Sequence, residues 1–145
     1  MMDNTVFVEG LSDSKANSIS KSIKNVFLKS TNNLEWLTPG DIVLLKPALN
    51  SPDPYPSTTH PLSIKVISEI LTENRAKVLI GDQSGLKDVL HHHSGVIHGS
   101  TRDNYLKSGM GTADDQFISF ESEGWDDGFI HYQSNHTPHG PMDFM

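Results

Sequence analysis

Residues 42–80 read IVLLKPALNSPDPYPSTTHPLSIKVISEILTENRAKVLI, and this stretch decides the fold. It begins and ends with short apolar runs, Ile42–Lys46 and Ala76–Ile80. Neither run alternates apolar with polar residues, which is typical of a strand covered on both faces in a parallel sheet. Between them, the residues from Pro61 to about Asn74 carry isoleucine and leucine at helical spacing. Strand, helix and strand in this order predict a right-handed parallel βαβ unit.

The loop that joins the first strand to the helix is rich in proline, at positions 47, 52, 54 and 56. Proline fixes φ and has no amide hydrogen, so we expect an extended and relatively stiff loop. Ser57, Thr58 and Thr59 are candidates for the helix cap, and Pro61 suits the first helical turn.

Three further elements are expected, two before the βαβ unit and one after it. Upstream, Thr5–Val8 is a short β-rich run, and a helix capped by Ser12 and Asp13 should extend to about Lys29. Downstream, Leu86–His93 is interpreted as a short helical stretch.

The C-terminal third completes the expected fold. Ser100–Asp103 has the spacing of a capping box and predicts another helix. Gln116–Glu121 and Phe129–Tyr132 partly alternate apolar with polar residues and predict an antiparallel edge hairpin. The expected architecture is α/β: a βαβ-based three-layer sandwich with a mainly parallel sheet. We expect a single domain at residues 1–132 and a flexible tail at residues 133–145.

The composition excludes several classes of function. The net charge of −7 disfavours nucleic acid and anionic membranes as partners, because both need a concentrated basic face. The absence of cysteine excludes disulfides, thiolate zinc sites and cysteine nucleophiles. The first residues do not resemble a signal peptide, and no apolar run is long enough to span a bilayer. We therefore expect a soluble, cytoplasmic protein with no nucleic-acid or membrane partner.

Polar residues follow both buried-type strands. Lys46 closes the first strand, and Asp82 lies two residues beyond the second. Because ligands bind outside the carboxyl ends of parallel strands, Lys46 and Asp82 are the candidate catalytic residues of a crevice at this edge. The candidate ligand-binding residues on the adjoining loops are Asn50, Thr58, Thr59, His60, Gln83 and Ser84. The alternative is that Lys46 and Asp82 form a structural ion pair, while Thr58 and Thr59 only cap a helix.

No metal site is predicted, and the cofactor, if there is one, is unknown. The chain has eight histidines, at positions 60, 91, 92, 93, 98, 131, 136 and 139. Consecutive residues of a helix point in different directions, so His91, His92 and His93 cannot converge on one ion, and surface histidine is the preferred interpretation. Gly81–Gly85 has neither the spacing of a serine nucleophile elbow nor that of a P-loop or dinucleotide fingerprint. The acidic pairs Asp114-Asp115 and Asp126-Asp127 are interpreted as solvated.

Several segments resemble a known family. They are Val43–Pro47, Asn50–Pro61 and Ala76–Gly85, with Gly99–Met110 similar to one branch of it. Together they resemble the family called domain of unknown function 362, over about residues 43–134. The resemblance implies no settled activity, and many members of that family are fused to ferredoxin-like iron–sulfur modules. The chain departs from the family at Ala48, where asparagine is usual, and it resembles only the N-terminal half of the longer family domain.

Two functions follow from these features. In the first, the crevice at the carboxyl ends of strands 42–46 and 76–80 binds a small anion or metabolite. Lys46 then anchors an anionic group, and Asp82 acts as acid, base or metal ligand. In the second, the chain is a non-enzymatic, truncated interaction or oligomerisation module, because a half-domain exposes sheet edge and apolar surface. A homo-oligomer is expected, and the sequence leaves open whether the protein is an enzyme.

Overall fold

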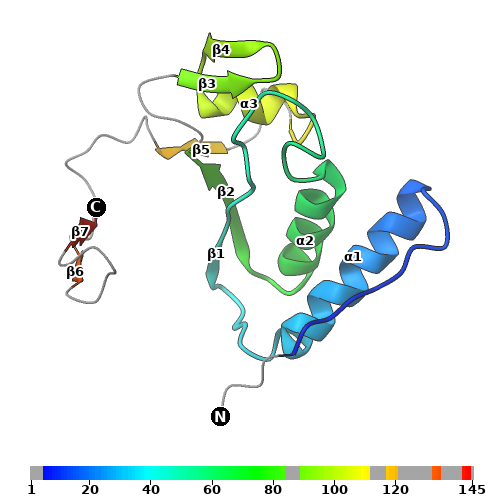
Figure 1. The fold of residues 1–145 in the computed structure, drawn as a ribbon. Coiled ribbons are helices and arrows are strands. Elements are labelled where there is room, and N and C mark those ends of the chain that lie inside the picture. Colours follow the sequence, from blue (N-terminus) through cyan, green and yellow to red (C-terminus); the bar gives the residue numbers. More distant parts are fainter. Residues whose placement is uncertain (1–4, 84–88, 112–116, 121–131, 135–141, 145) are drawn as a thin grey trace.

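The centre of the molecule is a parallel sheet of three strands in the order β1-β2-β5 (Figure 1). A computed structural model describes residues 5–83, 89–111, 117–120, 132–134 and 142–144. The strands are β1 (Ile42–Leu45), β2 (Lys77–Asp82) and β5 (Phe117–Ser119). In the β1–β2 pair, Ile42 lies opposite Lys77 and Leu45 opposite Ile80. The predicted parallel βαβ unit and the α/β class are confirmed.

The helix of this unit, α2 (Pro61–Glu73), covers one face of the sheet. It buries apolar side chains against Val43 and Leu45 of β1 and Val78 of β2. The buried residues of this cluster are Leu34, Val66, Ile70, Leu71 and Ala76. Burying one such leucine or isoleucine side chain contributes roughly 1.5–3 kcal/mol to folding, so this apolar face fixes α2 on the sheet.

The expected cap of α2 is wrong: the helix is capped by His60, not by Ser57, Thr58 or Thr59. The imidazole Nδ1 of His60 accepts a hydrogen bond of 3.1 Å from the amide of Leu62, and proline occupies the first turn as expected. The threonine hydroxyls hold the loop together instead.

The N-terminal helix, α1 (Ala16–Ser30), packs against α2. It begins after Lys15, whose amide donates to the Asp13 carboxylate, so the expected cap at Ser12 and Asp13 is one turn too early. A short 3-10 helix, η1 (Asn32–Leu34), follows it. The run Thr5–Val8 forms no strand.

An antiparallel hairpin stands where a helix was expected. β3 (Val89–His92) pairs with β4 (Gly95–His98), so the helical interpretation of Leu86–His93 is wrong for residues 89–92; residues 86–88 lie outside the described part. Gly95 has φ +127°, a left-handed value that glycine adopts without steric cost, and this allows the tight turn at Ser94. The next helix, α3 (Thr101–Lys107), begins with the predicted capping box of Ser100 and Asp103.

The second core cluster lies between α3 and the sheet. Leu49, Tyr105 and Phe117 are its buried residues, and the rings of Tyr105 and Phe117 stack with centroids 4.4 Å apart. Ile80 packs against this cluster, and Val78 packs against the α2 cluster. Since residues 78 and 80 share one face of β2, α2 and α3 cover the same face of the sheet.

The opposite face of β1 has no helix over it in the part of the chain that the structure describes. Ile42 and Leu44 point to this face and are 64% and 48% exposed. The third layer of the expected sandwich therefore stays a prediction.

The C-terminal segments differ in part from the expectation. β5 lies within the predicted strand Gln116–Glu121, but it pairs in parallel with β2. The expected antiparallel partner was the segment 129–132. Its residues 129–131 lie outside the described part, and Tyr132 begins β6. β6 (Tyr132–Ser134) pairs with β7 (Met142–Phe144), mostly inside the predicted tail 133–145, whose flexibility stays a prediction. None of the described helices combines the length and apolarity needed to cross a membrane.

Candidate functional site

The side chains of Lys46 and Asp82 meet at the carboxyl ends of β1 and β2. Lys46 Nζ lies 2.5 Å from Asp82 Oδ1. The cause is the parallel register: Leu45 pairs with Ile80, so the residues that follow them leave the sheet at the same edge. Asp82 is the last residue of β2, which begins one residue later and ends two residues later than predicted. The expected juxtaposition of these two residues is therefore present.

The two members of this pair differ sharply in exposure. The Asp82 side chain is 1% exposed, whereas that of Lys46 is 60% exposed. The second carboxylate oxygen, Oδ2, accepts a hydrogen bond of 2.9 Å from the amide of Leu49. The contact at Oδ1 is an ion pair without hydrogen-bond alignment. A buried carboxylate is costly unless it is paired, so the lysine and the loop amide together stabilise its charge.

The pair is connected to α3 through the loop after β1. The amide of Leu49 donates to Asp82, and its carbonyl accepts a hydrogen bond of 2.9 Å from Asn104 Nδ2. Leu49 and Asn104 are both fully buried. The loop that begins at Lys46 is thus fixed to β2 on one side and to α3 on the other, and the base of the lysine side chain is held in place.

Three of the expected ligand-binding residues make contacts within the loop. Thr58 is 4% exposed and donates to the carbonyl of Asp53 over 3.2 Å. Thr59 Oγ1 accepts a hydrogen bond of 2.8 Å from the amide of Ala48. The His60 ring caps α2 and lies edge-on to Tyr55, with centroids 5.0 Å apart. Thr58 thus uses its hydroxyl hydrogen within the loop, whereas Thr59 uses its hydroxyl oxygen as an acceptor and keeps its hydrogen.

The other expected ligand-binding residues are less constrained. Asn50 is exposed, and Gln83, directly after the ion-paired carboxylate, is half-buried. Ser84 lies outside the described residues. Of the six candidates, Asn50 and Gln83 are therefore the ones in the described part of the chain whose side chains have no assigned structural role.

A second polar cluster, centred on Asp53, was missed by the sequence analysis. Asp53 Oδ2 accepts hydrogen bonds from the Ser51 hydroxyl (2.8 Å) and from the His93 amide (2.9 Å). Asp53 Oδ1 lies 2.6 Å from His93 Nδ1, a distance at which the ring N–H donates to the carboxylate. This cluster ties the proline-rich loop to the turn of the β3–β4 hairpin. The Ser-x-Asp spacing signals a local turn, but the partner 40 residues away could not be found from spacing.

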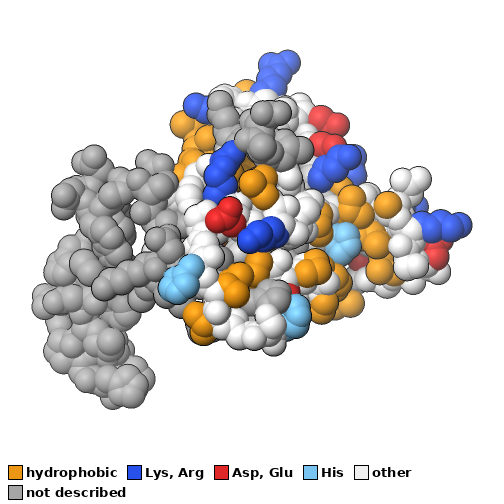
Figure 2. All heavy atoms as spheres, turned by 90° about the horizontal axis from the view of Figure 1, so that it is seen from above, with side chains coloured by type: hydrophobic (Ala, Val, Ile, Leu, Met, Phe, Trp, Pro, Cys, Tyr) orange, Lys and Arg blue, Asp and Glu red, His pale blue; other side chains and the backbone are white. Residues whose placement is uncertain are grey.

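No metal centre accompanies these clusters within the described ranges. No group of three or more histidine or acidic side chains there is arranged to hold an ion. Seen from the carboxyl ends of the strands, Lys and Arg side chains stand apart, with acidic, apolar and histidine side chains between them (Figure 2). Among the described residues of this face, a ligand meets single cations and no continuous basic patch, which favours a small ligand.

Comparison with protein-family models, with curated proteins and with solved structures finds no match to this chain. The resemblance to the domain of unknown function 362 family stays a prediction.

Proposed function

We propose that the protein binds a small anion or an anionic metabolite at the edge where Lys46 and Asp82 meet. The observation that carries this proposal is the asymmetry of the pair: a buried carboxylate holds a lysine whose side chain is 60% exposed. An ammonium group has three N–H donors, so contact with Asp82 leaves donors for a carboxylate or phosphate oxygen.

Asp82 has a positioning role in this proposal. Its two oxygens face Lys46 and the amide of Leu49, so it orients the ammonium group and does not itself contact the ligand. Because it also neutralises part of the lysine charge, we expect modest affinity, with Kd of about 0.1–1 mM. Catalytic roles for Lys46 and Asp82 would require contact with the substrate, and they stay predictions.

Titration with inorganic phosphate and with succinate, followed by calorimetry, tests the proposal. Lys46→Met should weaken binding by about tenfold or more, because a charge-assisted hydrogen bond is lost. Lys77→Met is the matched control, since Lys77 is an exposed lysine at the opposite end of the same pair of strands. Equal affinities for wild type and Lys46→Met, or no binding of either anion to wild type, would rule out the proposal.

A second candidate function is self-association as a non-enzymatic module. It is favoured by the exposure of Ile42 and Leu44 on the uncovered face of β1. In this reading a second copy supplies the missing layer of the sheet. Light scattering across a concentration series distinguishes the two candidates, because anion binding needs no change of mass.

In both candidates the protein is a cytoplasmic domain related to the N-terminal half of the domain of unknown function 362 family. The relation to this family is supported by the segments around Lys46 and Asp82 that resemble it. Without cysteine, the chain binds no iron–sulfur cluster through thiolates of its own.

A further inference from the structure

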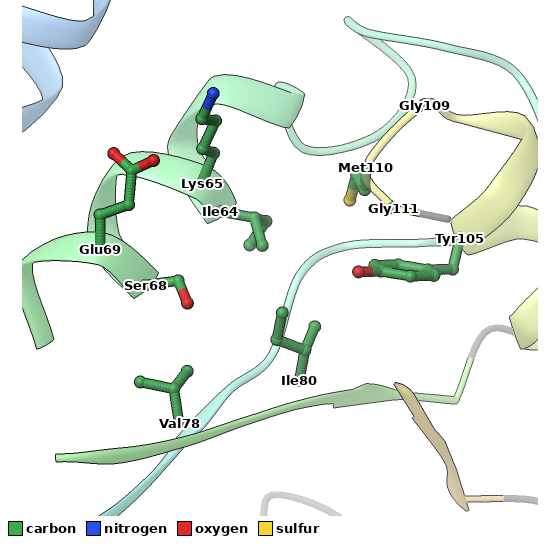
Figure 3. A pocket seen from close by; sticks show the side chains of 10 residues that line it. All are labelled: Ile64, Lys65, Ser68, Glu69, Val78, Ile80, Tyr105, Gly109, Met110 and Gly111. Atoms are coloured by element: carbon green, nitrogen blue, oxygen red, sulfur yellow. The ribbon is translucent and has the colours of Figure 1, made fainter. Parts of the chain in front are cut away.

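A cavity of about 510 Å³ lies between α2, β2 and α3, on the covered face of the sheet (Figure 3). Its size is within the usual range of small-molecule sites. It is separate from the Lys46–Asp82 pair, since neither residue lines it. Its walls come from three elements and from the turn after α3: Ile64, Lys65, Ser68, Glu69, Val78, Ile80, Tyr105, Gly109, Met110 and Gly111.

One side of the cavity is mainly apolar and rigid. Ile80 forms its floor, and the Tyr105 side chain points into it from α3 with its hydroxyl foremost (Figure 3). The ring is fixed between Phe117, which stacks on it, and Gly111, where a Cβ atom would lie 2.2 Å from the ring. Such a preformed wall binds an apolar group without the entropic cost of ordering it.

The other side of the cavity is polar and belongs to α2. Lys65 and Glu69 are one helical turn apart, carry opposite charges and are both exposed. The side chain of neither forms an ion pair or hydrogen bond with another described residue. Between them, the Ser68 hydroxyl is turned toward Val78 and the floor (Figure 3). The charged ends of Lys65 and Glu69 point away from the floor and stand at the outer rim of the cavity, on long side chains exposed to solvent (Figure 3).

We propose that this cavity binds an apolar α-amino acid in its zwitterionic form. The ligand carboxylate pairs with Lys65, and its ammonium group pairs with Glu69. Its side chain lies over Ile64 and Ile80, beside the Tyr105 ring. A ligand with one charge would use one of the two α2 side chains, whereas the zwitterion is complementary to both.

The test uses calorimetric titration of the full chain with L-leucine, L-methionine and L-phenylalanine. We expect at least one of them to bind with a Kd of about 1 mM or below, because two exposed charge pairs and one buried apolar side chain together contribute a binding free energy of about that order. Phenethylamine lacks the carboxylate and 3-phenylpropionate lacks the ammonium group, so each should bind about tenfold more weakly than L-phenylalanine. If none of the three amino acids binds at about 10 mM, the proposal is overturned.

Variants assign the binding to this cavity. Lys65→Met and Glu69→Gln should each weaken amino-acid binding by about tenfold. Glu73→Gln is the matched control, because Glu73 is an exposed acid one turn further along α2 that does not line the cavity. Unchanged affinity in both cavity variants would also overturn the proposal. Lys46→Met should leave amino-acid binding unchanged, which separates this site from the anion site proposed above.

Discussion

At the scale of single residues, the Lys46–Asp82 pair makes a stability prediction that is independent of any ligand. Lys46→Met leaves a carboxylate that is 1% exposed with the Leu49 amide as its remaining partner. We expect a loss of about 1–3 kcal/mol in the free energy of unfolding, below the cost for a fully buried pair because the lysine is largely exposed. Asp82→Asn keeps an oxygen for the Leu49 amide and removes the buried charge, so it should cost about 1 kcal/mol or less.

Urea unfolding at pH 7 measures both variants. The lysine substitution must be the more costly of the two. If Asp82→Asn were the more damaging change, the carboxylate charge itself would stabilise the fold. The expectation that an unpaired buried charge is the larger cost would then be wrong.

A second residue-scale prediction concerns Gly111 at the wall of the cavity. A Cβ atom there would lie 2.2 Å from two ring carbons and the hydroxyl oxygen of Tyr105, whose ring cannot move away because Phe117 stacks on it. Gly111→Ala should therefore destabilise the protein by about 1–3 kcal/mol, the usual cost of overpacking. Gly10→Ala is the control, since nothing lies within 4 Å of its Cβ position. Similar melting temperatures for the two variants would contradict the close packing of Tyr105.

Single residues also show where sequence reasoning ends. The pairing of Lys46 with Asp82 could be predicted, because two neighbouring parallel strands end at the same edge of the sheet. The capping role of His60 could not, since histidine is not among the favoured N-cap residues. Nor could the contact of Asp53 with His93, because nothing local links a proline-rich loop to a hairpin turn 40 residues away.

At the scale of elements, the capping box of α3 predicts a pH dependence of stability. Hydrogen bonds from the amide and then the hydroxyl of Ser100 lower the pKa of Asp103 below its ordinary value of 3.8. A lowered folded-state pKa means that the ionised cap stabilises the native state fully above the unfolded pKa. This stabilisation is lost as the pH falls below 3.8, through the folded-state pKa.

The variant Asp103→Asn isolates this contribution. At pH 7 it should be about 0.5–1 kcal/mol less stable than wild type, because an uncharged group interacts less favourably with the N-terminus of α3. The difference should shrink in acid, where wild type also loses the charge. Urea unfolding of both proteins from about pH 7, where this carboxyl is ionised, down to about pH 2.5 measures it. A difference that stays constant over this range would exclude the ionised cap as its source.

The elements differ in how well their sequences predict them. β1, α2 and β2 are apolar enough that the spacing of their apolar residues and their helix or strand propensities predict the same structure as the final packing. β3 lies where the sequence predicts the helical stretch Leu86–His93, and the local signal for the hairpin is the turn-forming pair Ser94 and Gly95. β5 was recognised as a strand, but its parallel pairing depends on β2 and has no local signal.

At the scale of the whole molecule, the arrangement of helices and sheet predicts self-association. α2 and α3 cover one face of the sheet, and Ile42 and Leu44 are exposed on the other face of β1. In the described part of the chain, β1 is also an edge strand, since its partner there is β2. An uncovered apolar face next to an unpaired edge favours association, and a second copy of the chain presents the same surface.

We therefore expect dimers at high protein concentration, measured as mass by light scattering. In the double variant Ile42→Thr, Leu44→Thr, threonine removes apolar area but, being β-branched, still favours a strand. This variant should raise the dimer dissociation constant by about tenfold or more. Val96→Thr is the control, because Val96 is 60% exposed on the β3–β4 hairpin, away from β1. If wild type stays monomeric at about 1 mM, the exposed face of β1 is not a self-association surface. Anion binding at Lys46 and amino-acid binding in the cavity would then be the candidate functions left.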